Sequence, residues 1–284
     1  MKKILVTGAN SYVGISFENW LRQWPEAYQV DSIGLRGDDW KDHDFSQYDV
    51  VYHLAAIVHV KESDSEKYFE VNRDLAFDVA KKAKQSGINQ FIFMSTMGVY
   101  GCESGYIKPE TLPTPKTPYA ISKFEAEKLI NQLADDHFNV AVLRPPMIYG
   151  KDCKGNYPRL ADMALKLPCF PKIENERSML YIDNLCEFVR VVIDQEDSGY
   201  FFPQNKEYVN TSELVKTIAE VHGRKICLTR IFNGVIKLLR LKVELLNKVF
   251  GSLVYEKSMS EYQVNYQIRE FLESIALTEL EEER

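Results

Sequence analysis

The first 24 residues constrain the fold more than any other part of this chain. Residues 3–7 form a short apolar run that predicts a buried strand, and residues 13–24 carry apolar side chains at helical spacing. A glycine loop joins them. Because the N-terminus of the helix that follows such a loop attracts phosphate, this order is typical of dinucleotide binding. The loop residues that we expect at the cofactor are Gly8, Asn10, Ser11, Tyr12, Val13 and Gly14.

Strands and helices continue to alternate over the first 150 residues. Further strands are predicted at residues 29–35, 49–54, 90–95 and 140–143. A long amphipathic helix is predicted over residues 63–86. The alternation predicts an α/β protein with a Rossmann-type doubly wound parallel sheet. Residues 40–45 are too few for a strand and a crossover helix, so the first half of the sheet is abbreviated, and Asp44-Phe45 could read the adenine from a strand end.

Beyond Gly150 the alternation stops, and helices are predicted at residues 157–167, 181–194 and 266–275. We therefore expect a Rossmann domain with the catalytic residues at 1–150 and a smaller, mostly helical substrate-binding region at 151–284. Residues 231–250 are very apolar with basic side chains between, a pattern that fits either a helix on a membrane surface or a helix packed on protein.

Composition excludes several classes of function. The net charge of -6 provides no global basic field for nucleic acid. Five cysteines are scattered without ligand spacing, which predicts free thiols in a reducing cytoplasm and no metal site. No uninterrupted apolar stretch is long enough to span a membrane.

Tyr119 and Lys123 are four residues apart at the start of a predicted helix, so they share one face. A close ammonium stabilises a phenolate, and we expect Lys123 to lower the pKa of Tyr119 from its usual value near ~10 towards neutrality. The strand at residues 90–95 ends in Ser95-Thr96, just before this helix. Hydroxyl, phenol and amine are therefore expected in one crevice at the carboxyl ends of the strands.

The cofactor choice depends on the end of the second strand. An acidic residue there would accept a hydrogen bond from the ribose 2′-hydroxyl of NAD. Asp31 lies too early in the strand for this contact, and Arg36 follows the strand. Because a guanidinium would pair with a 2′-phosphate, we prefer NADP over NAD, with a solvated Arg36 as the alternative. Other expected cofactor contacts are Asp44, Phe45, Leu54, Ala55, Ala56, Asn72, Ser95, Tyr119, Lys123 and Pro146.

The motifs TGANSYVG, HLAA, YAISK and LRPPMIYG, with Ser95-Thr96 before VYG, resemble the extended short-chain dehydrogenase/reductase family, in its nucleotide-sugar epimerase/dehydratase branch. The resemblance implies that Tyr119 is the general acid/base, that Lys123 assists it and that Thr96 holds the reacting oxygen. It also implies a UDP-sugar substrate, with Thr96, Met97, Asn156 and Arg177 as its contacts. Arg177 could instead pair with Glu174 or Glu176. Two departures are Ser11 in place of the middle glycine and the missing acidic strand end.

Within this family we expect chemistry at C4 of the sugar for surface polysaccharide synthesis, either reduction of a 4-keto sugar or 4-epimerisation with a retained NAD. A dehydratase is disfavoured because Met97-Gly98 stands where those enzymes have an Asp-Glu pair. A non-catalytic dinucleotide-binding regulator is the remote alternative. The family also implies a homodimer through the helices at residues 63–86 and 119–136.

Overall fold

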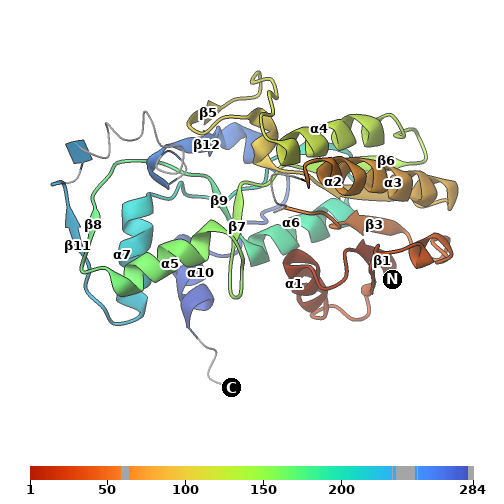
Figure 1. Ribbon diagram of the computed structural model, residues 1–284. Coiled ribbons are helices and arrows are strands. Elements are labelled where there is room, and N and C mark those ends of the chain that lie inside the picture. Colours follow the sequence, from red (N-terminus) through yellow and green to blue (C-terminus); the bar gives the residue numbers. More distant parts are fainter. Residues whose placement is uncertain (59–63, 232, 235–246, 248, 281–284) are drawn as a thin grey trace. The chain divides into compact units, whose positions relative to one another are not determined.

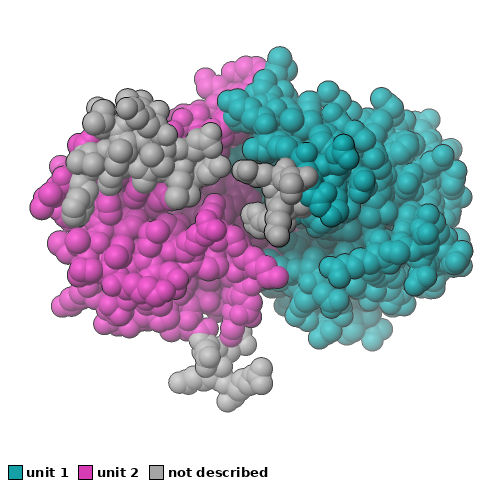
Figure 2. All heavy atoms as spheres, in the orientation of Figure 1, with its two compact units in different colours: residues 1–101, 112–145, 186–203 teal, residues 102–111, 146–185, 204–284 magenta. Residues whose placement is uncertain are grey.

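The computed structural model describes residues 1–58, 64–231, 233–234, 247 and 249–280 (Figure 1). The chain forms two compact units. The first contains residues 1–101, 112–145 and 186–203, and the second contains residues 102–111, 146–185 and 204–284 (Figure 2). We expected one boundary at residue 150, but each of these units contains residues from both sides of it. Strand β10 (Gly199–Phe201) pairs with β6 (Asn139–Leu143), and β5 (Gly105–Ile107) pairs with β12 (Leu253–Tyr255).

The predicted Rossmann-type sheet is confirmed in the first unit. Its other strands are β1 (Lys2–Thr7), β2 (Tyr28–Ile33), β3 (Val50–His53) and β4 (Gln90–Met94). Within the described residues the six strands have the order β10-β6-β4-β3-β1-β2, and each pair is parallel. All carboxyl ends therefore lie at one edge. The chain order reverses at β1, with β2 on one side and β3 on the other, which is where such sheets bind ligands.

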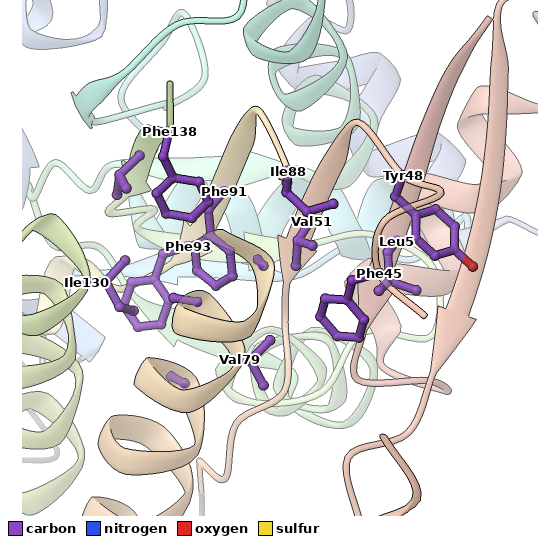
Figure 3. Close-up of a cluster of buried hydrophobic side chains, with 14 of the residues drawn as sticks. Leu5, Phe45, Tyr48, Val51, Val79, Ile88, Phe91, Phe93, Ile130 and Phe138 are labelled. Carbon is purple, nitrogen blue, oxygen red and sulfur yellow. The ribbon is translucent and has the colours of Figure 1, made fainter. Parts of the chain in front are cut away.

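Side chains that alternate along the strands bury both faces of this sheet. One face carries Leu5, Val51, Phe91 and Val140, and it packs on helices α3 (Ala76–Gln85) and α4 (Pro118–Asn131), whose Val79 and Ile130 point towards the strands (Figure 3). On the other face, Tyr52 lies edge-on against Phe17 of α1 (Tyr12–Leu21), with ring centroids 5.2 Å apart. Helices therefore cover both faces of the inner strands, which explains why β3, β4 and β6 are largely apolar, whereas the edge strands β2 and β10 are partly exposed.

Several local predictions were wrong. Residues 40–45 contain no strand: a 3-10 helix covers Asp39–Lys41, and Phe45 packs in the core at 1% exposure. The helix expected at residues 63–86 is divided into α2 (Glu66–Phe69), a π-helical segment (Glu70–Leu75) and α3. The loop after Thr96 begins with a 3-10 helix, Met97–Tyr100.

The second unit contains short strand pairs and helices. Its remaining strands are β7 (Met147–Tyr149), β8 (Cys169–Pro171), β9 (Met179–Tyr181) and β11 (Cys227–Thr229), and its helices include α5 (Asn156–Lys166), α7 (Thr211–Val221) and α10 (Phe271–Glu279). Helix α6 (Ile182–Asp194) has its first turn in this unit. The last helix begins later than predicted, since Tyr266 is buried and its hydroxyl donates to the Gln204 carbonyl at 3.1 Å.

Most of the apolar segment 231–250 lies outside the described residues, so its two interpretations are untested. No helix among the described residues combines the length and the apolarity needed to cross a membrane.

Candidate active site

The glycine loop after β1 makes close backbone contacts that only glycine allows. Gly8 has φ +102°, and a Cβ added there would lie 2.8 Å from the backbone N of Ala55, so only glycine lets the loop approach the end of β3 this closely. A Cβ on Gly14 would lie 2.7 Å from Ser11 Oγ. Ser11 is the N-cap of α1, and its hydroxyl accepts from Gly14 N at 3.1 Å. The residue that replaces the middle glycine therefore stabilises the helix start, whose first N–H groups have no partner inside the helix.

No acidic side chain stands at the last residue of β2, which is Ile33. Asp31 lies two residues before the last strand residue, Ile33, and it accepts from the Tyr48 hydroxyl at 3.0 Å. Arg36 is exposed beyond the strand end. Asp44 is also exposed, but it follows no strand and its carboxylate accepts from Ser46 N and Oγ at 2.9 and 2.7 Å. Asp44 therefore does not lie at a strand end, as we expected, and its contact with the adenine stays a prediction.

Tyr119 lies in the first turn of α4, where Thr117 caps the helix and Pro118 starts it. Thr96 leaves β4 in an extended conformation, and its hydroxyl accepts from Gly98 N at 3.0 Å. Burial raises the pKa of Tyr119 to about 12, while a hydrogen bond with the Thr96 side chain acts in the opposite direction. The Tyr68 ring lies edge-on to Tyr119, with centroids 6.1 Å apart. The Tyr119 phenol and the Thr96 hydroxyl thus meet as predicted, but desolvation of the phenol favours its neutral form.

Lys123 is buried at 2% exposure, and its Nζ lies 4.1 Å from the centroid of the Phe93 ring. Burial lowers the pKa of Lys123 to about 7, and the nearby Glu127 carboxylate opposes this shift. The groups that shift the pKa of Tyr119 are burial, Thr96 and Tyr68. The expectation that Lys123 lowers the pKa of Tyr119 therefore does not hold in this structure, because desolvation outweighs helical spacing.

Asn72 lies in the π-helical segment and is fully buried. Its amide accepts from Ile57 N at 2.8 Å and donates to Ile57 O at 3.0 Å and to Ser122 Oγ at 3.3 Å. Ser122 in turn donates to Tyr119 O at 2.9 Å. Asn72 therefore ties the loop after β3 to helix α4, and its side chain is occupied by protein partners.

Sequence reasoning missed a buried ion pair below this site. Glu127 and Arg144 form a two-point contact, and Ser95 donates its hydroxyl to the same carboxylate. The Ser95 hydroxyl, which we expected at the cofactor, is thus engaged by Glu127. The spacing of Glu127 four residues after Lys123 and the position of Arg144 at a strand end were the signals available in the sequence.

The remaining predicted contacts are spread over both units. Leu54, Ala55 and Ala56 are half-buried after β3, and Met97 is 8% exposed, with its N–H donating to Pro145 O at 2.9 Å. In the second unit, Pro146 is buried and Asn156 is exposed as the first residue of α5. In the part of the chain that the structure describes, no three His, Cys, Asp or Glu side chains gather closely enough to hold a metal ion.

Arg177 lies in the second unit and is half-buried. Its Nη1 donates to Gly251 O at 2.9 Å, and burial lowers its pKa. Among the described residues it forms no ion pair, since Glu174 contacts Arg230 and Glu176 accepts from Tyr106. The alternative that Arg177 pairs with Glu174 or Glu176 was therefore wrong.

A doubly wound parallel sheet with a glycine loop at its switch point and a Tyr-x-x-x-Lys pair after β4 defines a short-chain dehydrogenase/reductase. The chain belongs to the NAD dependent epimerase/dehydratase family, whose model matches residues 4–201. This result confirms the resemblance noted in the sequence motifs.

Individual relatives agree with this assignment. The chain is 33% identical over 184 residues to UDP-glucose 4-epimerase of Vibrio cholerae, a match that covers 60% of this chain and 56% of that protein. It is 25% identical to N-acetyl-alpha-D-glucosaminyl-diphospho-ditrans,octacis-undecaprenol 4-epimerase of Escherichia coli O157:H7, over 78% of this chain and 73% of that protein. The fold is similar to UDP-glucuronic acid 4-epimerase of Bacillus cereus, with a TM-score of 0.74, 20% identity and 97% of each chain covered. It is also similar to a dTDP-4-dehydrorhamnose reductase of Clostridium acetobutylicum, with a TM-score of 0.73, 20% identity and 96% and 97% of the two chains covered.

Proposed function

We propose that this protein is an NAD(P)-dependent oxidoreductase that acts at C4 of a UDP-sugar. The observation that carries the proposal is the meeting of Tyr119 and Thr96 at the carboxyl edge of the sheet, the edge that also bears the glycine loop. The close approach of Gly8 to Ala55 and the capped start of α1 fit a dinucleotide pyrophosphate. We further propose that the enzyme is a homodimer.

Each side chain has a defined task in this proposal. NAD(P), when bound, exchanges a hydride with the sugar carbon. Tyr119 transfers a proton to or from the C4 oxygen, and Thr96 holds that oxygen in place. Lys123 lies one helical turn beyond Tyr119 on α4, and its charged form adds positive charge to the site where the proton is exchanged. Lys123 is buried and Tyr119 is half-buried, so access of water to these proton transfers is limited.

Two outcomes of this chemistry differ in the fate of the cofactor. Reduction of a 4-keto sugar with fresh NADPH is our first choice, because Arg36 is exposed beyond β2 and Asp31 is held inside the strand by Tyr48. A 4-epimerase with retained NAD is the second, supported by the two relatives that are 4-epimerases. Incubation with UDP-glucose, UDP-N-acetylglucosamine and a 4-keto-6-deoxy UDP-sugar separates them: NADPH oxidation on the keto sugar indicates a reductase, and epimeric product without net oxidation indicates an epimerase.

Arg36→Ala tests the cofactor choice. We expect the affinity for NADPH to fall about tenfold or more, since the variant loses a charge-assisted contact with the 2′-phosphate, while the affinity for NADH is unchanged. Fluorescence titration of both cofactors measures this. Arg22→Ala is the control, because Arg22 is also exposed and contacts only Glu18 on its own helix. Equal NADPH affinity in wild type and Arg36→Ala would remove Arg36 from the proposal.

Arg177→Met tests the substrate contact. Arg177 is half-buried, and among the described residues its guanidinium donates to one backbone carbonyl, which leaves N–H donors for a diphosphate. We expect KM for the UDP-sugar to rise about tenfold or more with little change in kcat. Arg230→Met is the control, because Arg230 is exposed and contacts Glu174 at 3.4 Å. A KM that rises equally in both variants would assign the effect to general surface charge.

A further inference from the structure

Glu127 is a fully buried carboxylate one helical turn beyond Lys123 on α4. Its Oε2 accepts from Arg144 Nη2 at 2.6 Å, and its Oε1 accepts from Arg144 Nε at 3.1 Å. The Ser95 hydroxyl also donates to Oε1. Both oxygens of the carboxylate are therefore engaged by partners from two other elements of the first unit, with the geometry of a strong two-point ion pair.

Arg144 is held just as firmly at the end of β6. Its Nη1 donates to Tyr100 Oη at 3.0 Å, and its backbone N–H donates to Phe201 O at 2.9 Å. The centre of the guanidinium lies 4.5 Å from the centroid of the Tyr200 ring. A buried charge pair with this many hydrogen-bond partners has one defined geometry, so it holds the segments that carry those partners in place.

The pair connects the strand ends that carry the proposed chemistry. Ser95 directly precedes Thr96, and Tyr100 ends the 3-10 helix that Thr96 caps. Glu127 lies on the same helix as Tyr119. The ion pair therefore ties the ends of β4 and β6 to α4, and Thr96 and Tyr119 lie next to β4 and on α4, respectively.

The same carboxylate is the negative charge that acts on Lys123 among the described residues. From β3, His53 faces the amine, and burial lowers the pKa of His53 to about 3, so it is neutral. From β4 the amine meets the Phe93 ring, and Tyr119 on its own helix is a neutral phenol. Arg144 lies behind Glu127 from β6. Glu127 thus opposes the loss of the Lys123 proton on burial.

We propose that Glu127 is a positioning residue of the C4 reaction: paired with Arg144, it holds Thr96 beside Tyr119 and keeps Lys123 charged. The inference rests on the role of Lys123 in the proposed function. In this proposal the Glu127–Arg144 pair supports catalysis in addition to stabilising the fold.

Glu127→Gln, which keeps the size of the side chain, tests the electrostatic part. Removal of the carboxylate leaves the Arg144 charge unopposed, so the pKa of Lys123 is expected to fall by about one unit or more. Nuclear magnetic resonance of the lysine side-chain nitrogen in the cofactor-free protein, assigned with Lys123→Arg, measures this shift directly. At pH 7 kcat is expected to fall about tenfold, and the loss shrinks as the pH is lowered and Lys123 regains its proton. A purely structural role would give a loss that does not depend on pH.

Two further variants make the result decisive. Glu125→Gln is the control, because Glu125 lies on the same helix but is 41% exposed and pairs with Arg73 at 2.8 Å; it should leave Lys123 and kcat unchanged. The double variant Glu127→Gln/Arg144→Met also removes the guanidinium that the single variant leaves unpaired, so we expect it to fold even if the single variant does not. It is expected to lower the pKa of Lys123 less than the single variant does. An unshifted Lys123 titration in Glu127→Gln, or in the double variant if the single variant does not fold, overturns the proposal. If the variants show the shift but the wild-type protein turns over no sugar, only the proposed function is contradicted.

Discussion

Tyr119→Phe is expected to lower the turnover of the UDP-sugar by a factor of about 10³, within the usual range for loss of a general acid or base. The ring of the variant fills the same space beside Tyr68, so packing is retained, but no group remains to exchange a proton with the C4 oxygen. Cofactor affinity should change little, because α1 and the glycine loop are untouched. Steady-state turnover together with fluorescence titration of NADPH separates these two effects.

Tyr28→Phe is the control for this substitution. It also removes a phenol hydroxyl, one that donates to Asp194 at 2.7 Å on the surface, and it should keep wild-type turnover with a small loss of stability, about 1 kcal/mol. Full turnover in Tyr119→Phe would refute the assignment of Tyr119 as the general acid or base. Cofactor binding without turnover of any sugar in the wild type would instead favour a dinucleotide-binding regulator.

Gly8→Ala is expected to weaken NADPH binding by at least about tenfold and to destabilise the fold by about 1–3 kcal/mol. The losses of stability and of NADPH affinity have two physical causes. Alanine is strained at φ +102°, and its Cβ would stand 2.8 Å from the backbone N of Ala55, so the loop must move away from β3. Movement of this loop displaces the start of α1 from the pyrophosphate.

Gly87→Ala separates strain from displacement. Gly87 follows α3 and has φ +77°, but no atom lies within 4 Å of a Cβ added there, so the variant carries the backbone strain without the clash. We expect both variants to melt earlier in a thermal unfolding scan, and only Gly8→Ala to lose NADPH affinity. Equal affinities in the two variants would show that the close approach to Ala55 is not needed for binding.

The parts of the fold that sequence reasoning placed well are those with strong local signals. The strand predicted at residues 90–95 is β4, because the apolar run Phe91–Met94 lies in the middle of a parallel sheet whose two faces are covered. Helix α4 begins where Thr117 and Pro118 predict a start. By contrast, residues 186–203 return to the first unit through the pairing of β10 with β6, a contact between distant segments that no local pattern reveals.

The sequence by itself determined that strand, glycine loop and helix come first, that a hydroxyl precedes a Tyr-Lys pair, and that the chain belongs to a family with this order. These features are local, since they depend on spacing along the chain. Only the tertiary structure decided the electrostatics. Burial raises the pKa of Tyr119, lowers that of Lys123, and places the Glu127–Arg144 pair beneath them. Desolvation and charge pairing depend on which side chains meet in space, and those neighbours come from β3, β4 and β6, far from α4 in the sequence.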